Sequence, residues 1–175
     1  QYLDNDSDLT GTDWVTDSNN EDNWKSGPSQ LGYNEGDEAT LVGDGDGDFT
    51  TAPRAITTYF RKTIEVSQVD GFSSMLFRLV RDDGAVVYVN GIEAFRDSMP
   101  EGPINAETLA SRSQGGSNER NFFEHSVSPS LFINGTNVIA VEVHQRSGNS
   151  SDMSFDLELI GEVDGEISNA GPTPG

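Results

Sequence analysis

The chain of 175 residues contains no cysteine. This absence excludes a disulfide framework, a zinc site built on thiolates and a cysteine nucleophile. It also removes the usual sequence evidence for the redox compartment in which a protein works. A chain of this length can bury one sizeable core without covalent cross-links, so a single domain is expected.

Positive charge is also scarce. Ten lysines and arginines stand against thirty aspartates and glutamates, which gives a net charge of -20 at pH 7. Such a charge disfavours binding to the phosphate backbone of nucleic acids and to anionic membranes. No apolar run reaches the roughly 18 residues of a membrane helix. We therefore expect neither a nucleic acid nor a membrane as a partner.

The common catalytic motifs are missing as well. The sequence has no serine nucleophile elbow, no HExxH and no phosphate-binding glycine loop that ends in Lys-Ser or Lys-Thr. With thirty carboxylates, pairs at the spacing of a glycosidase arise by chance in any fold. Acidic residues alone are therefore no evidence for catalysis, and we expect a protein that is not an enzyme.

What the sequence does contain is the alternation of β-strands, most clearly in residues 77–96. Apolar side chains there recur every second residue, which is the period of a half-buried strand. Asp83-Gly84 and Asn90-Gly91 interrupt the alternation, and both dipeptides favour tight hairpin turns. The stretch is predicted to form three consecutive strands in a meander, and a second layer must cover its apolar face.

Residues 56–66, 121–127, 136–146 and 154–160 show similar alternation. Together with short strands near the start, they predict an all-β fold, an antiparallel β-sandwich of about eight strands. In residues 136–146, Glu142 and His144 are expected on the outward face. The residues expected in the core are Phe77, Leu79, Val87, Val89, Ile139, Val141, Val143, Phe155 and Leu157.

Two segments do not show this alternation. Residues 98–121 carry two prolines and a Gly-Gly pair, which indicates a long loop. Residues 162–175 have the composition of a linker. We therefore expect one β-sandwich domain over residues 1–161, followed by a C-terminal linker over residues 162–175.

Two acidic runs place carboxylates at alternate positions: Asp4, Asp6 and Asp8, and then Asp44, Asp46 and Asp48. This spacing lets several oxygens converge on Ca²⁺, which takes six to eight oxygen ligands. Neither run matches an EF-hand loop, because the glycine at the sixth position and the glutamate at the twelfth are missing. A solvated acidic loop is the alternative for each run.

Six segments carry a resemblance to a known family: WVTDSNNEDNW, LGYNEGDEAT, TTYFRKTIEV, RLVRDDGAVVYVNGIEAFR, GTNVIAVEVHQ and SFDLELIG. They resemble the galactose-binding-like jelly-roll domains of secreted bacterial polysaccharide-degrading and surface proteins, over nearly the whole chain up to Gly161. VYVNG and GTNVIAVEV are also similar to the sugar-binding jelly roll that accompanies many glycoside hydrolases. The resemblance implies a secreted or extracellular protein whose partners are a polysaccharide or oligosaccharide and other domains of the same polypeptide.

The resemblance also implies a calcium cofactor, because related jelly rolls commonly hold a structural Ca²⁺ between an early loop and the last strand. The candidate ligands are the carboxylates of the two acidic runs, the second of which contains Asp44, Asp46 and Asp48. The alternative set is Asp37 and Glu38 of the early loop with Asp156 or Glu158 of the last strand.

Sugar recognition needs planar hydrogen-bonding groups beside an aromatic face. Such side chains fall on the outward period of residues 56–66 and at the end of residues 136–146, with the first turn of residues 77–96 as an additional source of contacts. The candidate ligand residues are Tyr59, Arg61, Asp82, Asp83, His144, Gln145 and Arg146. This composite site requires the two strands to be neighbours. The alternatives are a solvated strand end, or a site in the loops around Tyr33 and Asp37.

Exposure of the aromatic residues bears on the same question. Tyr33 and Tyr59 are expected to be the exposed stacking faces, and Trp14 and Trp24 are expected to anchor the core or loops.

We interpret the chain as a non-catalytic carbohydrate-binding module that raises the effective concentration of a tethered partner near a polysaccharide. The rival interpretation is a calcium-stabilised structural or adhesive domain of an extracellular surface protein or filament, without a sugar site.

Overall fold

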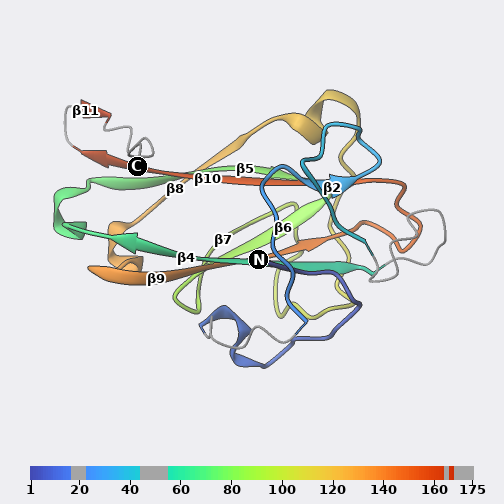
Figure 1. The fold of residues 1–175 in the computed structure, drawn as a ribbon, viewed down its shortest axis with the longest axis horizontal. Helices are drawn as coiled ribbons and strands as arrows, with labels where there is room; N and C mark the ends of the chain where they lie inside the picture. Colours follow the sequence, from blue (N-terminus) through green and yellow to red (C-terminus); the bar gives the residue numbers. More distant parts are fainter. Residues whose placement is uncertain (17–22, 44–54, 164–165, 168–175) are drawn as a thin grey trace.

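The computed structural model describes residues 1–16, 23–43, 55–163 and 166–167, and they form two packed β-sheets (Figure 1). The first sheet has the order β1-β4-β9-β6-β7, with strands Tyr2–Leu3, Thr57–Val66, Gly135–His144, Gly84–Val89 and Ile92–Asp97. The second has the order β3-β2-β10-β5-β8, with strands Thr40–Leu41, Leu31–Tyr33, Met153–Val163, Ser74–Arg81 and Phe123–Val127. The predicted all-β sandwich is confirmed.

The remaining elements are short. Strand β11 (Glu166–Ile167) pairs with β10, so the second sheet continues past residue 161, where the linker was predicted to follow. Helical structure in the described ranges consists of the 3-10 turns η1 (Asp13–Val15), η2 (Val69–Gly71), η3 (Gly116–Arg120) and η4 (Pro129–Leu131). None of the described helices is long and apolar enough to cross a membrane. Within the described ranges, β2 and β3 pair in parallel and the other strand pairs are antiparallel.

The predicted meander is half right. Strands β6 and β7 form a hairpin at Asn90-Gly91, whose φ angles of 51° and 82° suit this turn. Strand β5, however, lies in the other sheet, so Asp82 and Asp83 carry the chain from one sheet to the other. Sequence period does not distinguish a hairpin from such a crossover, because the inward positions alternate in both.

The Asp83-Gly84 dipeptide predicted a hairpin turn, but Gly84 has a different structural role. It lies at the start of β6 without a positive φ, and a Cβ atom built on it would lie 2.9 Å from the Ser98 carbonyl oxygen and 3.0 Å from the Ala110 Cβ. The glycine therefore permits close approach of the loop around residues 98–110.

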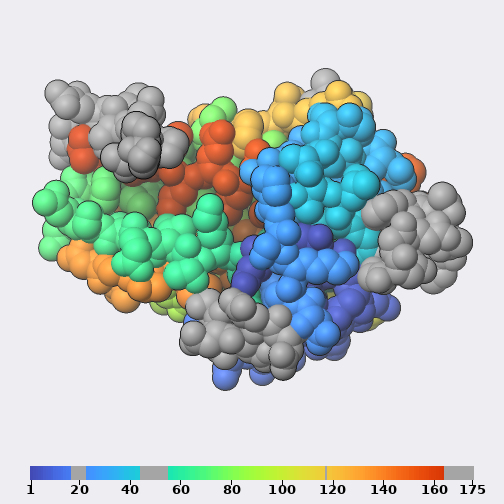
Figure 2. Space-filling model, in the orientation of Figure 1, coloured from blue at the N-terminus to red at the C-terminus, as the bar shows by residue number. Residues whose placement is uncertain are grey.

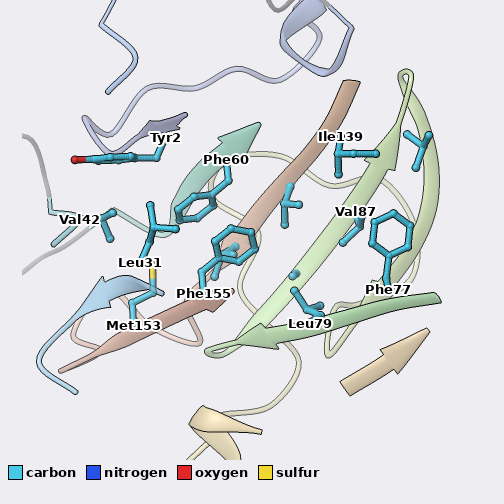
Figure 3. Packing of buried hydrophobic residues seen from close by; sticks show 14 of the residues in the cluster. Tyr2, Leu31, Val42, Phe60, Phe77, Leu79, Val87, Ile139, Met153 and Phe155 are labelled. Carbon is cyan, nitrogen blue, oxygen red and sulfur yellow. The ribbon is translucent and has the colours of Figure 1, made fainter. Parts of the chain in front are cut away.

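The core lies between the sheets and contains the residues that the alternation predicted (Figure 3). Phe60 and Phe155 stack across the sheets, with ring centroids 4.0 Å apart. Of the predicted core residues, only Leu157 is half-buried, and it packs against the core from its edge. The register of β9 is therefore as predicted, with Val141 and Val143 facing inward.

A third layer covers the outer face of the first sheet. Figure 1 shows the N-terminal segment with η1, in blue, on the side of β4 and β9 that faces away from the second sheet. The Trp14 ring meets the rings of Tyr59 and Tyr88 edge-on, with centroid distances of 4.9 and 6.0 Å. In Figure 2 the blue and cyan atoms of the N-terminal part form a continuous surface over one half of the visible face. Residues on the outer face of this sheet are therefore not necessarily exposed.

Candidate functional site

The two strands of the predicted composite site are neighbours. Strands β4 and β9 pair along their whole length, with Thr57 opposite His144 and Tyr59 opposite Glu142. Their polar side chains lie on the outward face, as predicted. This adjacency was the step that the sequence left open, and the structure confirms it.

The exposure expected for this face is wrong. Tyr59 is only 1% exposed, because the N-terminal segment covers it, and its hydroxyl accepts a hydrogen bond from the Leu9 N–H at 3.4 Å. Burial raises the pKa of Tyr59 to about 12. The Arg61 guanidinium lies 4.0 Å from the Trp24 ring centroid, and its Nε donates to Gln1 Oε1 at 2.8 Å. Tyr59 and Arg61 therefore hold the N-terminal segment in place, and Tyr33 is buried as well.

His144 is fully buried at the end of β9. Its Nδ1 lies 2.8 Å from the Thr108 carbonyl oxygen and 2.9 Å from Thr57 Oγ1. Because a carbonyl oxygen only accepts, Nδ1 carries the hydrogen. Thr57 Oγ1 donates in turn to the Ala106 carbonyl oxygen at 2.7 Å. His144 thus fixes the loop of residues 98–121 to the end of the first sheet.

Asp83 ties three segments together at the same end. Its Oδ1 accepts from the Gln114 N–H at 2.6 Å and its Oδ2 from the Arg146 N–H at 2.7 Å. Ala110 N–H donates to the Gln145 carbonyl oxygen at 3.1 Å, beside the same junction. Arg146 is the exposed member of the predicted ligand set, and the other six are buried.

Asp82 lies beneath this junction with its Oδ2 buried and without a hydrogen-bond partner in the described structure. Burial raises the pKa of Asp82 to about 9, helped by its hydrogen bond to Asp83 and by the charges of Asp83, Asp152 and Glu119. A pKa this high keeps the Asp82 carboxyl protonated at neutral pH. The charges around it are those of Asp83, Asp152 and Glu119, and Arg120 forms an ion pair with Glu35 close to Glu119.

Among the predicted calcium ligands that the structure describes, Asp37, Glu38 and Asp156 do not belong to the carboxylate group that forms among the described residues. Asp37 forms an ion pair with Arg120, at 3.1 Å between Oδ2 and Nε. Burial by itself raises the pKa of Glu38, but backbone N–H groups of residues 35–38 outweigh it and lower the pKa. Asp156 accepts the Leu157 N–H at 2.8 Å. Asp44, Asp46 and Asp48 lie outside the described residues.

A different carboxylate group does form. Glu35 of the early loop, Glu119 of η3 and Asp152, directly before β10, each offer an oxygen within 4.8 Å of the other two. Burial raises the pKa of Glu119, and the charges of Glu35 and Asp152 raise it further. The location between an early loop and the last strand is the one that the resemblance implied. Glu119 had no signal in the sequence, because it comes from the long loop.

The donor atoms near this group suit a hard cation. Besides Asp82 Oδ2, the side-chain oxygens of Gln145 and Ser154 are buried without a partner in the described structure. Gln145 Nε2 donates to the Asp152 carbonyl oxygen at 3.2 Å, and Ser154 follows Asp152 by two residues. Carboxylate, amide and hydroxyl oxygens are ligands that Ca²⁺ prefers. The residues present therefore fit a calcium ion.

No family model matches the sequence, and the search of curated proteins gives no match. Among solved structures, a β-glucuronidase of Bacteroides uniformis has 16% identity and a TM-score of 0.48, over 92% of this chain and 18% of that one. A β-glycosidase of Bacteroides vulgatus has 15% identity and a TM-score of 0.41, over 92% and 20%. A β-D-mannosidase of Dictyoglomus thermophilum has 15% identity and a TM-score of 0.34, over 50% and 9%.

The chain therefore spans no more than a fifth of the length of these three structures. At such identities and TM-scores, the likeness does not transfer an activity or a ligand to the chain.

Proposed function

We propose that the chain is a non-catalytic carbohydrate-binding module of a larger secreted protein. The observation that carries the proposal is the construction of one end of the sandwich, on the right in Figure 1, where β4 and β10 begin and β5 and β9 end. There, buried polar side chains fix three loop segments through hydrogen bonds and leave Arg146 exposed. A rigid framework that carries exposed polar loops is a common way to build a binding site.

The predicted residues keep a part in this site, but in different roles. Asp83, His144 and Gln145 position the loops, and Arg146 is available for ligand contact. Tyr59 and Arg61 lie farther along β4, under the N-terminal segment, and do not contribute to the ligand surface. The proposed ligand surface is therefore the loop end of the sandwich and not the outward face of β4 and β9, where the sequence predicted it.

A glycan array probed with the purified chain tests this function. We expect retention on one class of plant or microbial polysaccharide and no release of sugar from it. Binding to no glycan, by a chain with a cooperative thermal transition, would favour the structural or adhesive role and overturn the proposal.

We also propose that the Glu35, Glu119 and Asp152 group holds a structural Ca²⁺. Its support is the convergence of three carboxylates with unpartnered buried oxygens nearby. An ion there supplies positive charge that offsets the repulsion of these carboxylates, and it joins the early loop, η3 and the start of β10. The Ca²⁺ is therefore proposed to stabilise the loop end and has no catalytic part.

A further inference from the structure

Most of the described lysines and arginines are engaged by other side chains, but a few are not. Among the described lysines and arginines, five form ion pairs with carboxylates: Lys25, Arg78, Arg81, Arg96 and Arg120. Arg61 is buried against Trp24. The structure shows no ion pair within the described ranges for Lys62, Arg112 or Arg146, and all three are exposed. In a chain with thirty carboxylates, such cations stand out.

Two of these three cations lie on neighbouring segments at the loop end. Arg112 lies between Ala110, whose N–H donates to the Gln145 carbonyl, and Gln114, whose N–H donates to Asp83 Oδ1. The N–H of Arg146 donates to the other oxygen of the same Asp83 carboxylate. The backbone around both arginines is therefore fixed by one buried acid, although their side chains are free to reach outward.

The carboxylate that fixes this junction, Asp83, forms no ion pair with either guanidinium in the described part of the chain. Both Asp83 oxygens accept backbone N–H groups, and the side chain is only 3% exposed. Leu109, three residues before Arg112 in the same loop, is 39% exposed, although it is a large apolar residue. The surface thus combines two unpaired guanidinium groups with an apolar side chain.

We propose that Arg112 and Arg146 bind the anionic groups, uronate carboxylates or sulfate esters, of an acidic polysaccharide. The guanidinium fork pairs two donors with two oxygens of such a group, and this geometry suits carboxylate and sulfate alike. Leu109 contacts the apolar face of a sugar ring. The net charge of -20 repels a polyanion over most of the surface, so the two unpaired guanidinium groups favour its approach at this end. The inference rests on the proposed function and adds the charge of the ligand to it.

Affinity electrophoresis tests the proposal, with gels that contain polygalacturonate, neutral galactan, dextran sulfate or neutral dextran. Retention by polygalacturonate alone identifies the carboxylate as the ligand, and retention by dextran sulfate alone identifies the sulfate. The double variant Arg112→Gln, Arg146→Gln should weaken retention by the anionic polymer about tenfold or more, because each charge-assisted contact contributes strongly to binding. Added NaCl should weaken wild-type retention in the same gels.

Lys62→Gln is the matched control. Lys62 is exposed and lies on β4, where it pairs with Ile139 of β9. It is five residues from the start of β4 at Thr57, which corresponds to roughly 16 Å along the strand. This variant should bind as the wild type does, and thermal melting should show that all variants fold.

Equal losses in the Lys62 and arginine variants would show that only net charge matters and would overturn the proposal. Retention of the wild type and the double variant alike by a neutral polymer would also overturn it, but would leave the carbohydrate-binding function intact. Failure of every polymer to retain the wild type, together with an empty glycan array, would refute both.

Discussion

At the scale of single residues, the buried polar side chains decide how this sandwich is closed. The buried Arg81 forms a polar group with the half-buried Asp97 and His125 between the edges of the two sheets, where β7 faces β8. Arg81 Nη2 lies 2.7 Å from Asp97 Oδ1, and His125 Nε2 lies 3.0 Å from Asp97 Oδ2. Burial alone raises the pKa of Asp97, but the hydrogen bonds from His125 and Arg81 outweigh it and lower the pKa below its usual value of 3.8.

This lowered pKa predicts a pH-dependent contribution to stability. A carboxyl with a lower pKa in the folded state stabilises the fold above its unfolded pKa, and the contribution is lost as pH falls through the folded pKa. Asp97→Asn should therefore cost about 2 kcal/mol of unfolding free energy at pH 7, and less below pH 3.8. Urea denaturation at both pH values measures the difference. The exposed Asp70→Asn serves as control, and a cost for Asp97→Asn that stays constant with pH would contradict the prediction.

A second prediction at this scale concerns Gly84. Its alanine variant brings a Cβ within 3.0 Å of Ser98 and Ala110, so overpacking should cost about 1–3 kcal/mol. Gly71 is the matched control, because a Cβ there meets nothing within 4 Å, and its variant should be neutral or slightly stabilising. Urea denaturation of both variants gives the comparison, and equal stability of the two would show that Gly84 is not packed as described.

At the scale of elements, the alternation in the sequence predicted the strands and their inner faces, because a two-residue period follows directly from strand geometry. It did not predict the crossover at Asp82 and Asp83, where a turn dipeptide marks a change of sheet. Nor did it predict the burial of Tyr59 and His144. Their cover comes from the N-terminal segment and the loop of residues 98–121, which have no periodicity to interpret.

The N-terminal cover is testable through Trp14, whose ring packs against Tyr59 and Tyr88. Trp14→Ala should lower the unfolding free energy by about 2–4 kcal/mol, near the lower range for loss of a large aromatic side chain, because Trp14 is only half-buried. Leu41→Ala is the control, since Leu41 is 58% exposed and its truncation should cost little. Both are measured by chemical denaturation. A Trp14 variant as stable as the wild type would show that the segment adds no packing energy.

At the scale of the whole molecule, two sheets and a covering layer leave one end where carboxylates, arginines and fixed loops meet. The resemblance implied a cation between an early loop and the last strand, but the sequence did not identify the carboxylates that converge there. Glu119 reaches the site from the long loop, and Asp152 precedes the strand on which Asp156 was expected to serve. Only the fold brings these groups together.

Calcium is therefore expected to raise the melting temperature. An ion that binds only the folded state adds about 2.7 kcal/mol when its concentration is a hundred times Kd. Differential scanning calorimetry in chelator and in millimolar Ca²⁺ measures the shift. Glu119→Gln should abolish most of it, whereas the exposed Glu107→Gln on the same loop should not. An unchanged melting temperature after verified removal of metal would refute the calcium proposal.

The claim that the loop end binds carbohydrate is tested most directly by titrating the ¹⁵N-labelled chain with the oligosaccharide retained most strongly on the glycan array. The amide resonances of Ala110, Gln114 and Arg146 should shift with increasing ligand. Those on the outer face of the second sheet, where Arg78 stacks on Phe122, should stay unchanged. Shifts confined to that face, or to the opposite end of the sandwich, would contradict the proposed site.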